Sequence, residues 1–168
     1  PMNPCRCGNF GLPGQECSRA PKCAEEYRAR ISGPLLDRID IQIEVPAVSP
    51  WDLADVRPGE SSDEIRKRVI AAREIQKKRF AAFGCPSLLT NSQLKGELLE
   101  QSAALDNEAK ALLLSYADRT AMSARAYHRT LRLARTIADL QNENKLLRIH
   151  IAEALSLRWK TPDYKSRR

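Results

Sequence analysis

Four of the five cysteines of this 168-residue chain lie within its first 23 residues, at Cys5, Cys7, Cys17 and Cys23. The residues between them are rich in glycine and proline, which favour turns and cannot supply a hydrophobic core. Such a segment needs an anchor to hold one conformation. Four thiolates can bind one zinc ion tetrahedrally, so the cluster favours a structural zinc site.

Other uses of these thiols stay open at this point, because Cys-x-Cys is a tight spacing for two ligands of one metal. Free thiols are one alternative, and disulfides or redox chemistry are others. Disulfides are disfavoured in the cytoplasm, where we expect the protein, since the sequence shows no signal-peptide core. It also contains no apolar run of the roughly 18 residues that cross a bilayer, so no membrane partner is expected. Cys85 is expected to be an ordinary thiol.

The composition is that of a globular protein with an excess of positive charge. Hydrophobic residues make up 42% and charged residues 29%, and the length allows one or two small domains. Lys and Arg outnumber Asp and Glu by 28 to 21, which gives a net charge of +7. This charge points weakly to an anionic partner.

The pattern of the chain changes at Pro46. Before it, a short helix is expected over 24–31 and a strand over 39–45, where apolar and polar residues alternate. Residues 47–60 read as a linker. After it, Ser61-x-x-Glu64 is a capping-box pattern that opens a helix reaching Gly84. Further helices are expected over 93–100, 106–119, 123–140 and 144–158, followed by a polar tail at 159–168.

The helix expected over 123–140 carries an arginine stripe. Arg125, Arg129 and Arg132 stack on the side opposite a broad apolar face. A solvated helix face accounts for many such stripes. The planar guanidinium fork is also suited to phosphate, so both interpretations stand from this helix alone.

Several longer motifs occur in order along the chain. They are Met2-Asn3-Pro4-Cys5-x-Cys7-Gly8, the run from Ile31 to Asp40, Arg57-Pro58-Gly59-Glu60-Ser61-Ser62, Ser123-Ala124-Arg125-Ala126-Tyr127, and the run from Ala134 to Leu140. Together they closely resemble the ComM/YifB family of bacterial magnesium-chelatase-like AAA+ ATPases. The resemblance covers nearly the whole chain, up to about Leu157.

The resemblance implies a mainly α fold in which a remnant of the AAA+ α/β core precedes a helical lid. Residues 1–46 would be the C-terminal end of the core, with the Cys-rich loop and the arginine-finger segment. Residues 47–60 would be the linker, 61–158 the helical lid of the magnesium-chelatase C-terminal type, and 159–168 the polar tail.

Three residues match functional positions of the family. Asn3 matches the sensor 1 asparagine, which orients the attacking water, and Arg38 matches the arginine finger that reaches a neighbouring subunit's nucleotide. Arg125 matches sensor 2, which contacts the phosphates. Phosphoryl transfer is catalysed mainly by positioning and positive charge, which these residue types supply. The plainer interpretations are a turn residue for Asn3, and for Arg38 a local ion pair with Asp37 or Asp40.

The sequence contains no G-x-x-x-x-G-K-[ST] motif and no apolar strand ending in Asp-Glu. The elements that bind ATP and magnesium are therefore expected upstream of Pro1, and the chain alone is expected to be inactive. Arg129 and Arg132 receive no role from the resemblance.

The resemblance implies a homo-oligomeric ring ATPase, expected to be a hexamer, that remodels DNA by branch migration in competence or recombination. One alternative is an ATP-driven metal-chelatase subunit. The cysteine cluster, a feature of the ComM/YifB branch, favours DNA. A second alternative is a non-enzymatic, zinc-stabilised nucleic-acid-binding module, which leaves the Leu-Leu-Asp-Arg motif at Arg38 unexplained. The residues that would contact DNA are not assigned.

Overall fold

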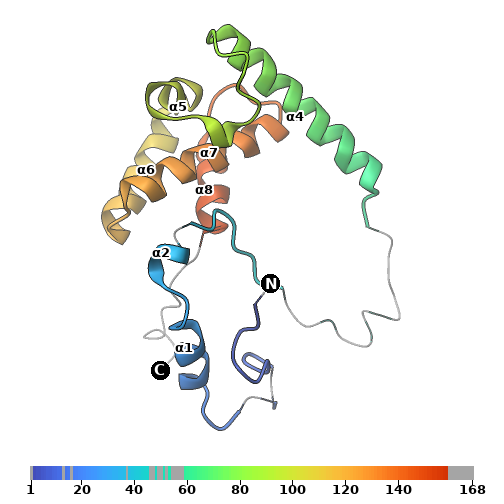
Figure 1. Cartoon of the computed structure of the whole chain (residues 1–168), viewed down its shortest axis with the longest axis vertical. Helices are drawn as coiled ribbons and strands as arrows, with labels where there is room; N and C mark the ends of the chain where they lie inside the picture. The colour runs from blue at the N-terminus through green and yellow to red at the C-terminus, as the bar shows by residue number, and fades with distance from the viewer. Residues whose placement is uncertain are drawn as a thin grey trace. The chain divides into compact units, whose positions relative to one another are not determined.

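The computed structural model describes residues 2–12, 14–15, 17–36, 38–45, 48, 51, 53 and 59–158. Most of the expected linker and the whole of the expected polar tail lie outside the described residues. The chain divides into two compact units, one of Pro1–Ile39 and Ile43–Val56 and the other of Asp40–Gln42 and Arg57–Arg168 (Figure 1).

The first unit is built largely from turns. Two of them are closed by backbone hydrogen bonds, from Gly8 N–H to the Cys5 carbonyl at 3.1 Å and from Ala20 N–H to the Cys17 carbonyl at 2.9 Å. Two short helices follow, α1 (Lys22–Arg28) and α2 (Gly33–Leu36). Among the described residues of this unit only Cys5 and Ala24 are buried. A conventional hydrophobic core does not hold this unit together, as its composition predicts.

The strand expected over 39–45 is not formed. These residues adopt no regular secondary structure, and the side chains of Ile43 and Val45 are 71% and 78% exposed. A period-two pattern produces a strand only when another strand pairs with it, since the backbone N–H and C=O groups need partners. Within the described residues no strand exists to pair with this segment. The strand prediction was therefore wrong, because the segment has no partner strand among the described residues.

The second unit is a bundle around one central helix. It contains α4 (Ser62–Ala82), the short 3₁₀ helix η1 (Asn91–Gln93), α5 (Gly96–Ser102), α6 (Asn107–Thr120), α7 (Ala124–Leu140) and α8 (Arg148–Ser156). Helix α7 contacts α4, η1, α5 and α8, and α6 packs on α8 (Figure 1). The core is the set of apolar side chains that these contacts bury: Phe80, Leu94, Leu99, Ala103, Ala109, Leu113, Leu131, Ala134, Ile137, Ala138, Leu146, Ile151, Ala154 and Leu155. The expected mainly helical fold is confirmed.

Capping residues explain where three of these helices begin. Ser61 and Glu64 form the predicted capping box, in which Glu64 N–H donates to Ser61 Oγ at 3.3 Å and Ser61 N–H donates to Glu64 Oε2 at 2.9 Å. Asp106 caps α6, and Ser123 caps α7. Each side chain satisfies an N–H that has no partner within its own helix. The predicted starts of these helices agree with the structure because caps are local signals.

Helix α8 is shorter than expected, because it starts at Arg148 and not near Asn144. The preceding residues are used in a different contact. Leu146 forms an isolated parallel bridge with Leu105, in which Leu146 N–H donates to the Ala104 carbonyl at 3.0 Å and Asp106 N–H donates to the Leu146 carbonyl at 3.1 Å. This bridge joins the start of α6 to the start of α8. No helix of the described part is long and apolar enough to span a bilayer.

Candidate functional site

Arg125 occupies the first turn of α7. Ser123 Oγ accepts the Ala126 N–H at 3.2 Å, and this cap fixes the point at which the helix begins. Arg125 is the second helical residue and is exposed. The first turn of a helix carries partial positive charge, so Arg125 adds its cation where anions are already favoured.

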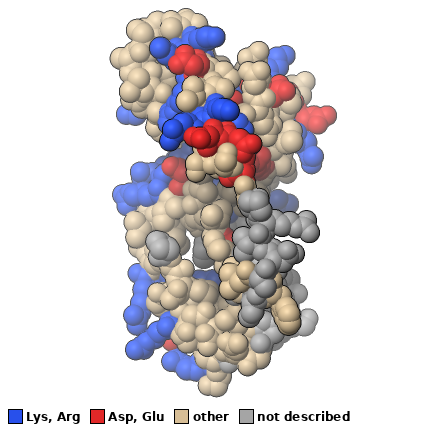
Figure 2. Space-filling model, turned by 90° about the vertical axis from the view of Figure 1, so that its right-hand side faces the viewer, with Lys and Arg blue, Asp and Glu red and all other residues tan. Residues whose placement is uncertain are grey.

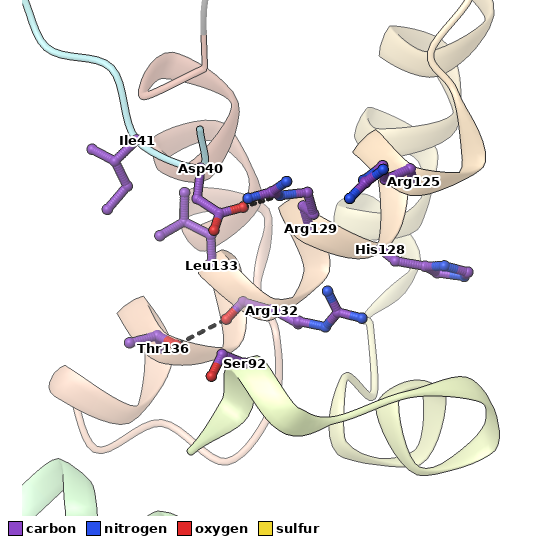
Figure 3. Close-up of a pocket in the computed structure, with 9 residues that line it drawn as sticks. All are labelled: Asp40, Ile41, Ser92, Arg125, His128, Arg129, Arg132, Leu133 and Thr136. Atoms are coloured by element: carbon purple, nitrogen blue, oxygen red, sulfur yellow. Dashed lines mark hydrogen bonds and ion pairs between the residues drawn. The ribbon is translucent and has the colours of Figure 1, made fainter. Parts of the chain in front are cut away.

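An open pocket of about 790 Å³ lies along this part of α7. It is lined by Asp40, Ile41, Ser92, Arg125, His128, Arg129, Arg132, Leu133 and Thr136. Figure 3 shows Arg125 extending toward Arg129, and Arg129 extending on to Asp40, whereas His128 points away from both. The arginine stripe therefore faces a concave surface with one acidic lining residue among those described.

Two of the three arginines have partners within the protein. Arg129 forms an ion pair with Asp40, 89 residues away in sequence. Arg132 Nε donates to the Leu94 carbonyl at 2.9 Å, which orients its guanidinium beside the pocket. A purely solvated helix face is thus the wrong description of Arg129 and Arg132.

The Asp40 carboxylate is the counter-charge in this pocket. Its hydrogen bond from Arg129 lowers the pKa of Asp40 below the usual value, and the charges of Arg158 and Arg132 act in the same direction while burial opposes them. Arg38 is exposed, and the local ion pair considered for it would involve Asp37, which lies outside the described residues. Asp40 is instead committed to Arg129.

A buried ion network lies behind the pocket and was not predicted from the sequence. Asp139 is fully buried on α7 and accepts hydrogen bonds from Arg79 of α4, Asn91 of η1 and Arg135 of α7. The Arg79 contact is bidentate. Arg135 is also fully buried, and burial lowers its pKa while Asp139 opposes that shift. Its guanidinium further donates to the carbonyls of Glu143 and Asn144.

The network continues to the pocket wall. Asn91 Nδ2 donates to Thr136 Oγ1 at 3.1 Å, and Thr136 Oγ1 donates to the Arg132 carbonyl at 2.9 Å. Thr136 and Arg132 both line the pocket. The available sequence signal was Arg135 and Asp139, an ion pair at spacing i, i+4 on the apolar side of α7. Its third member, Arg79, lies 60 residues from Asp139, and only the fold reveals that contact.

Three of the four N-terminal cysteines converge. The ligand atoms of Cys5, Cys7 and Cys23 all lie within 4.8 Å of one another, with Sγ–Sγ distances of 3.1 Å for Cys5–Cys7 and 3.9 Å for Cys7–Cys23. Cys17 is not part of this group of three, and its thiol interacts mainly with that of Cys23. All five cysteines are free thiols, so the disulfide alternative does not hold in this structure.

This geometry suits a tetrahedral metal. Zinc–sulfur bonds of about 2.3 Å in a tetrahedron place the sulfurs about 3.8 Å apart. The Cys7–Cys23 distance of 3.9 Å matches this spacing, whereas the Cys5–Cys7 distance of 3.1 Å is shorter. The interaction between the Cys17 and Cys23 thiols lowers the pKa of Cys17 and raises the pKa of Cys23 to about 12. Arg6 and Arg30 line the same hollow and can balance thiolate charge, whereas Arg19 is ion-paired there with Glu26.

The residues matched to nucleotide roles fall in different units. Asn3 and Arg38 belong to the first unit, Arg38 directly after α2, and Arg125 belongs to the second. All three side chains are exposed. The structure brings Arg125 together with Arg129 and Arg132, and it brings Cys5, Cys7 and Cys23 together.

Comparison with known families covers both units. Residues 59–158 match the family described as magnesium chelatase, subunit ChlI C-terminal, and residues 1–53 match magnesium chelatase, subunit ChlI. The chain therefore belongs to the magnesium chelatase family, and its helical second unit is that family's C-terminal domain.

Individual relatives confirm the ComM/YifB resemblance. The chain is 35% identical over 158 residues to competence protein ComM of Haemophilus influenzae, a match that covers 94% of this chain and 29% of that protein. It is 36% identical over the same length to the uncharacterized protein YifB of Escherichia coli, with the same coverage. An uncharacterized protein of Mycobacterium tuberculosis is 34% identical over 158 residues, a match that covers 93% of this chain and 30% of that protein. The chain thus spans less than a third of these relatives.

Proposed function

We propose that this chain is the C-terminal part of a ring-forming AAA+ ATPase that couples ATP binding and hydrolysis to DNA remodelling, as in branch migration during competence or recombination. The observation that carries the proposal is Arg125 at the start of α7, in a pocket that two further arginines line. Its volume of about 790 Å³ is in the range of small-ligand sites. Three guanidinium groups suit a triphosphate.

The proposed roles follow the chemistry of phosphoryl transfer. Arg125 acts as sensor 2 and stabilises charge on the phosphates, and Asn3 acts as sensor 1 and orients water. Arg38 is the arginine finger for the neighbouring subunit, which makes activity depend on a homo-oligomeric ring, proposed to be a hexamer. ATP and magnesium are placed mainly on a segment that carries the phosphate-binding loop, since this sequence lacks that motif.

Structural zinc is proposed for Cys5, Cys7, Cys17 and Cys23. The convergence of Cys5, Cys7 and Cys23, in a unit whose described residues include almost no buried apolar side chains, supports this assignment, and Cys17 is proposed as the fourth ligand. Zinc binding would supply the folding free energy that the turns cannot.

DNA is the proposed partner because of charge and kinship. Residues 57–158 carry 18 Lys and Arg against 12 Asp and Glu, and one relative is described as a competence protein. Figure 2 shows Lys and Arg on the visible face as separate groups with Asp and Glu between them. No individual DNA-contacting residue is assigned.

The decisive experiment measures ATP turnover of the intact ATPase that contains this chain. Arg38→Ala is expected to lower kcat by about 10³-fold or more while nucleotide binding survives, because the finger acts on the transition state. Arg125→Ala is expected to weaken both nucleotide binding and ATP turnover. Arg119→Ala, at the exposed end of α6, is the control and should change neither. Unchanged turnover in Arg38→Ala would contradict the assignment.

Subunit mixing tests the ring. Arg38→Ala subunits mixed with subunits defective in the phosphate-binding loop should recover part of the activity, because each supplies what the other lacks only across an interface. The substrate is tested in the same assay. Stimulation by branched DNA supports a DNA motor, whereas stimulation by a tetrapyrrole with magnesium would favour the chelatase alternative, which the family description keeps relevant.

A further inference from the structure

The arginine-lined pocket already contains an anion of the protein itself. Among its described lining residues, the Asp40 carboxylate faces the three guanidinium groups of Arg125, Arg129 and Arg132. Arg129 is ion-paired with it, while Arg132 Nε donates to a neutral carbonyl. These four groups leave two positive charges in the pocket without a carboxylate. The net positive charge of these groups therefore favours an anion that carries more negative charge than one carboxylate.

The two partners of the ion pair are unequally placed. The Arg129 side chain is 14% exposed and that of Asp40 is 54% exposed. A mostly buried guanidinium needs an anion beside it, because a buried charge without a partner is costly. A half-exposed carboxylate can be transferred to water at much lower cost. An incoming anion can therefore take the place of Asp40 on Arg129, as long as it can reach the guanidinium.

Residues 40–42 belong to the second unit, and two of the described contacts hold them there. One is the Asp40–Arg129 ion pair, and the other is the hydrogen bond from Gln42 N–H to the Leu157 carbonyl at 2.8 Å. The segment forms no strand, and Ile41 is half exposed. Loss of the ion pair would therefore weaken one of the contacts that hold this segment on the helical domain.

We propose that the phosphates of a nucleoside triphosphate displace the Asp40 carboxylate from Arg129 and so release residues 40–42 from the helical domain. The proposal rests on the proposed function in taking the pocket as the place where those phosphates bind. Phosphate offers several oxygens and more negative charge than one carboxylate, and it can contact Arg125 and Arg132 at the same time. Asp40 is thus a competitor that sets the phosphate affinity of the site.

The exchange couples the pocket to the segment that carries Arg38. Two residues of extended chain span at most about 7 Å, so Arg38 cannot move independently of Asp40. Release of Asp40 by phosphate in one subunit would therefore change the freedom of that subunit's own arginine finger. Such a contact links nucleotide state to the finger by a defined two-state element.

The test measures binding of tripolyphosphate to the 168-residue chain by calorimetry at constant ionic strength. Asp40→Asn is expected to tighten binding by about 5- to 10-fold, because the competitor is gone. Asp118→Asn removes an exposed carboxylate of α6 and should change nothing. Affinity that is equal or weaker in Asp40→Asn would overturn the proposal.

A double mutant separates displacement from simple charge removal. In an Arg129→Gln background the Asp40→Asn gain should vanish if the two groups act as a pair. A gain in affinity that persists in this background would mean that the Asp40 charge repels the ligand at a distance without pairing with Arg129, and the proposal would fail. Thermal unfolding of each variant confirms that it is folded. Arg129→Met, which keeps an unbranched side chain of similar length but removes the charge, provides a second background should Arg129→Gln unfold.

Hydrogen exchange reads out the release directly. The Gln42 amide should exchange faster when tripolyphosphate saturates the wild-type chain and should already be fast in Asp40→Asn. Unchanged Gln42 exchange would refute the release step. If a short DNA duplex, and not tripolyphosphate, bound with the Asp40 dependence, the ligand class would be wrong. None of these outcomes requires ATP turnover, so they are distinguishable from a failed Arg38→Ala test.

Discussion

Replacing Asp139 tests how far the buried ion network stabilises the helical domain. Asp139→Asn keeps the shape of the side chain but removes the one carboxylate that both Arg79 and Arg135 contact. Both Asp139 and Arg135 are fully buried, and Arg79 is 14% exposed. Removing one partner of a buried pair costs about 3–5 kcal/mol, because the other charge stays buried without compensation.

That cost is large for a domain of this size. The free energy of unfolding of a small domain is about 5–15 kcal/mol, so Asp139→Asn should lose about a fifth of the stability or more. Unfolding entropy of about 2.1 cal/mol/K per residue over roughly 100 residues converts 3 kcal/mol into a fall in Tm of about 15 °C. Urea denaturation followed by circular dichroism measures the free energy of unfolding, and a constant m-value confirms that the two states are unchanged.

The control is Asp118→Asn, an exposed carboxylate on α6, which should stay within about 0.5 kcal/mol of the wild type. Arg79→Gln leaves the Asp139–Arg135 pair in place and should cost about 1.5–3 kcal/mol, the range for a hydrogen bond to a charged group. It serves as the readout if Asp139→Asn does not fold. A loss below about 1 kcal/mol in Asp139→Asn would refute the reasoning, since the network would then be stable without its anion.

Two further predictions concern the cysteine cluster and the histidine of α8. Purified chain should contain about one equivalent of zinc by elemental analysis, lost in Cys17→Ser and retained in Cys85→Ser; a metal-free wild type of equal stability would contradict the site. His150 is buried, accepts Leu147 N–H at Nδ1 and faces Gln141 through Nε2, and burial lowers its pKa with help from Arg135. The unfolded state therefore binds the proton first, and stability should be constant above the unfolded pKa of about 6.5 and fall below it by up to about 1.4 kcal/mol per pH unit. Urea melts between pH 5 and 8 should show this slope, and His150→Gln should flatten it; an equal slope in that variant would assign it to other groups.

Local signals allowed much of the helical domain to be predicted. Ser61, Asp106 and Ser123 cap helices through contacts within three residues, so the sequence contains both partners. The strand at 39–45 failed for the opposite reason, since its pattern says nothing of whether a partner strand is present. The start of α8 was misplaced because the bridge between Leu105 and Leu146 joins residues 41 positions apart.

The same division holds for the candidate sites. The cysteine cluster was predictable because four rare side chains lie within 23 residues, and turns bring three of them together. The arginine stripe of α7 was visible in the sequence, but its meaning was not. Arg129 could be solvated or paired until the fold brought Asp40 to it across 89 residues.

The sequence by itself determined the kind of elements present: a thiol-rich turn segment, a set of capped helices, and an arginine stripe on one of them. These depend on interactions within a turn or two of the chain. The tertiary structure alone decided that Arg79, Asn91 and Arg135 share the carboxylate of Asp139, and that Asp40 counters the arginines of the pocket. A charged side chain can be hydrated at any exposed position of a helix. Only packing against another element determines which charged side chains are buried and therefore need a partner.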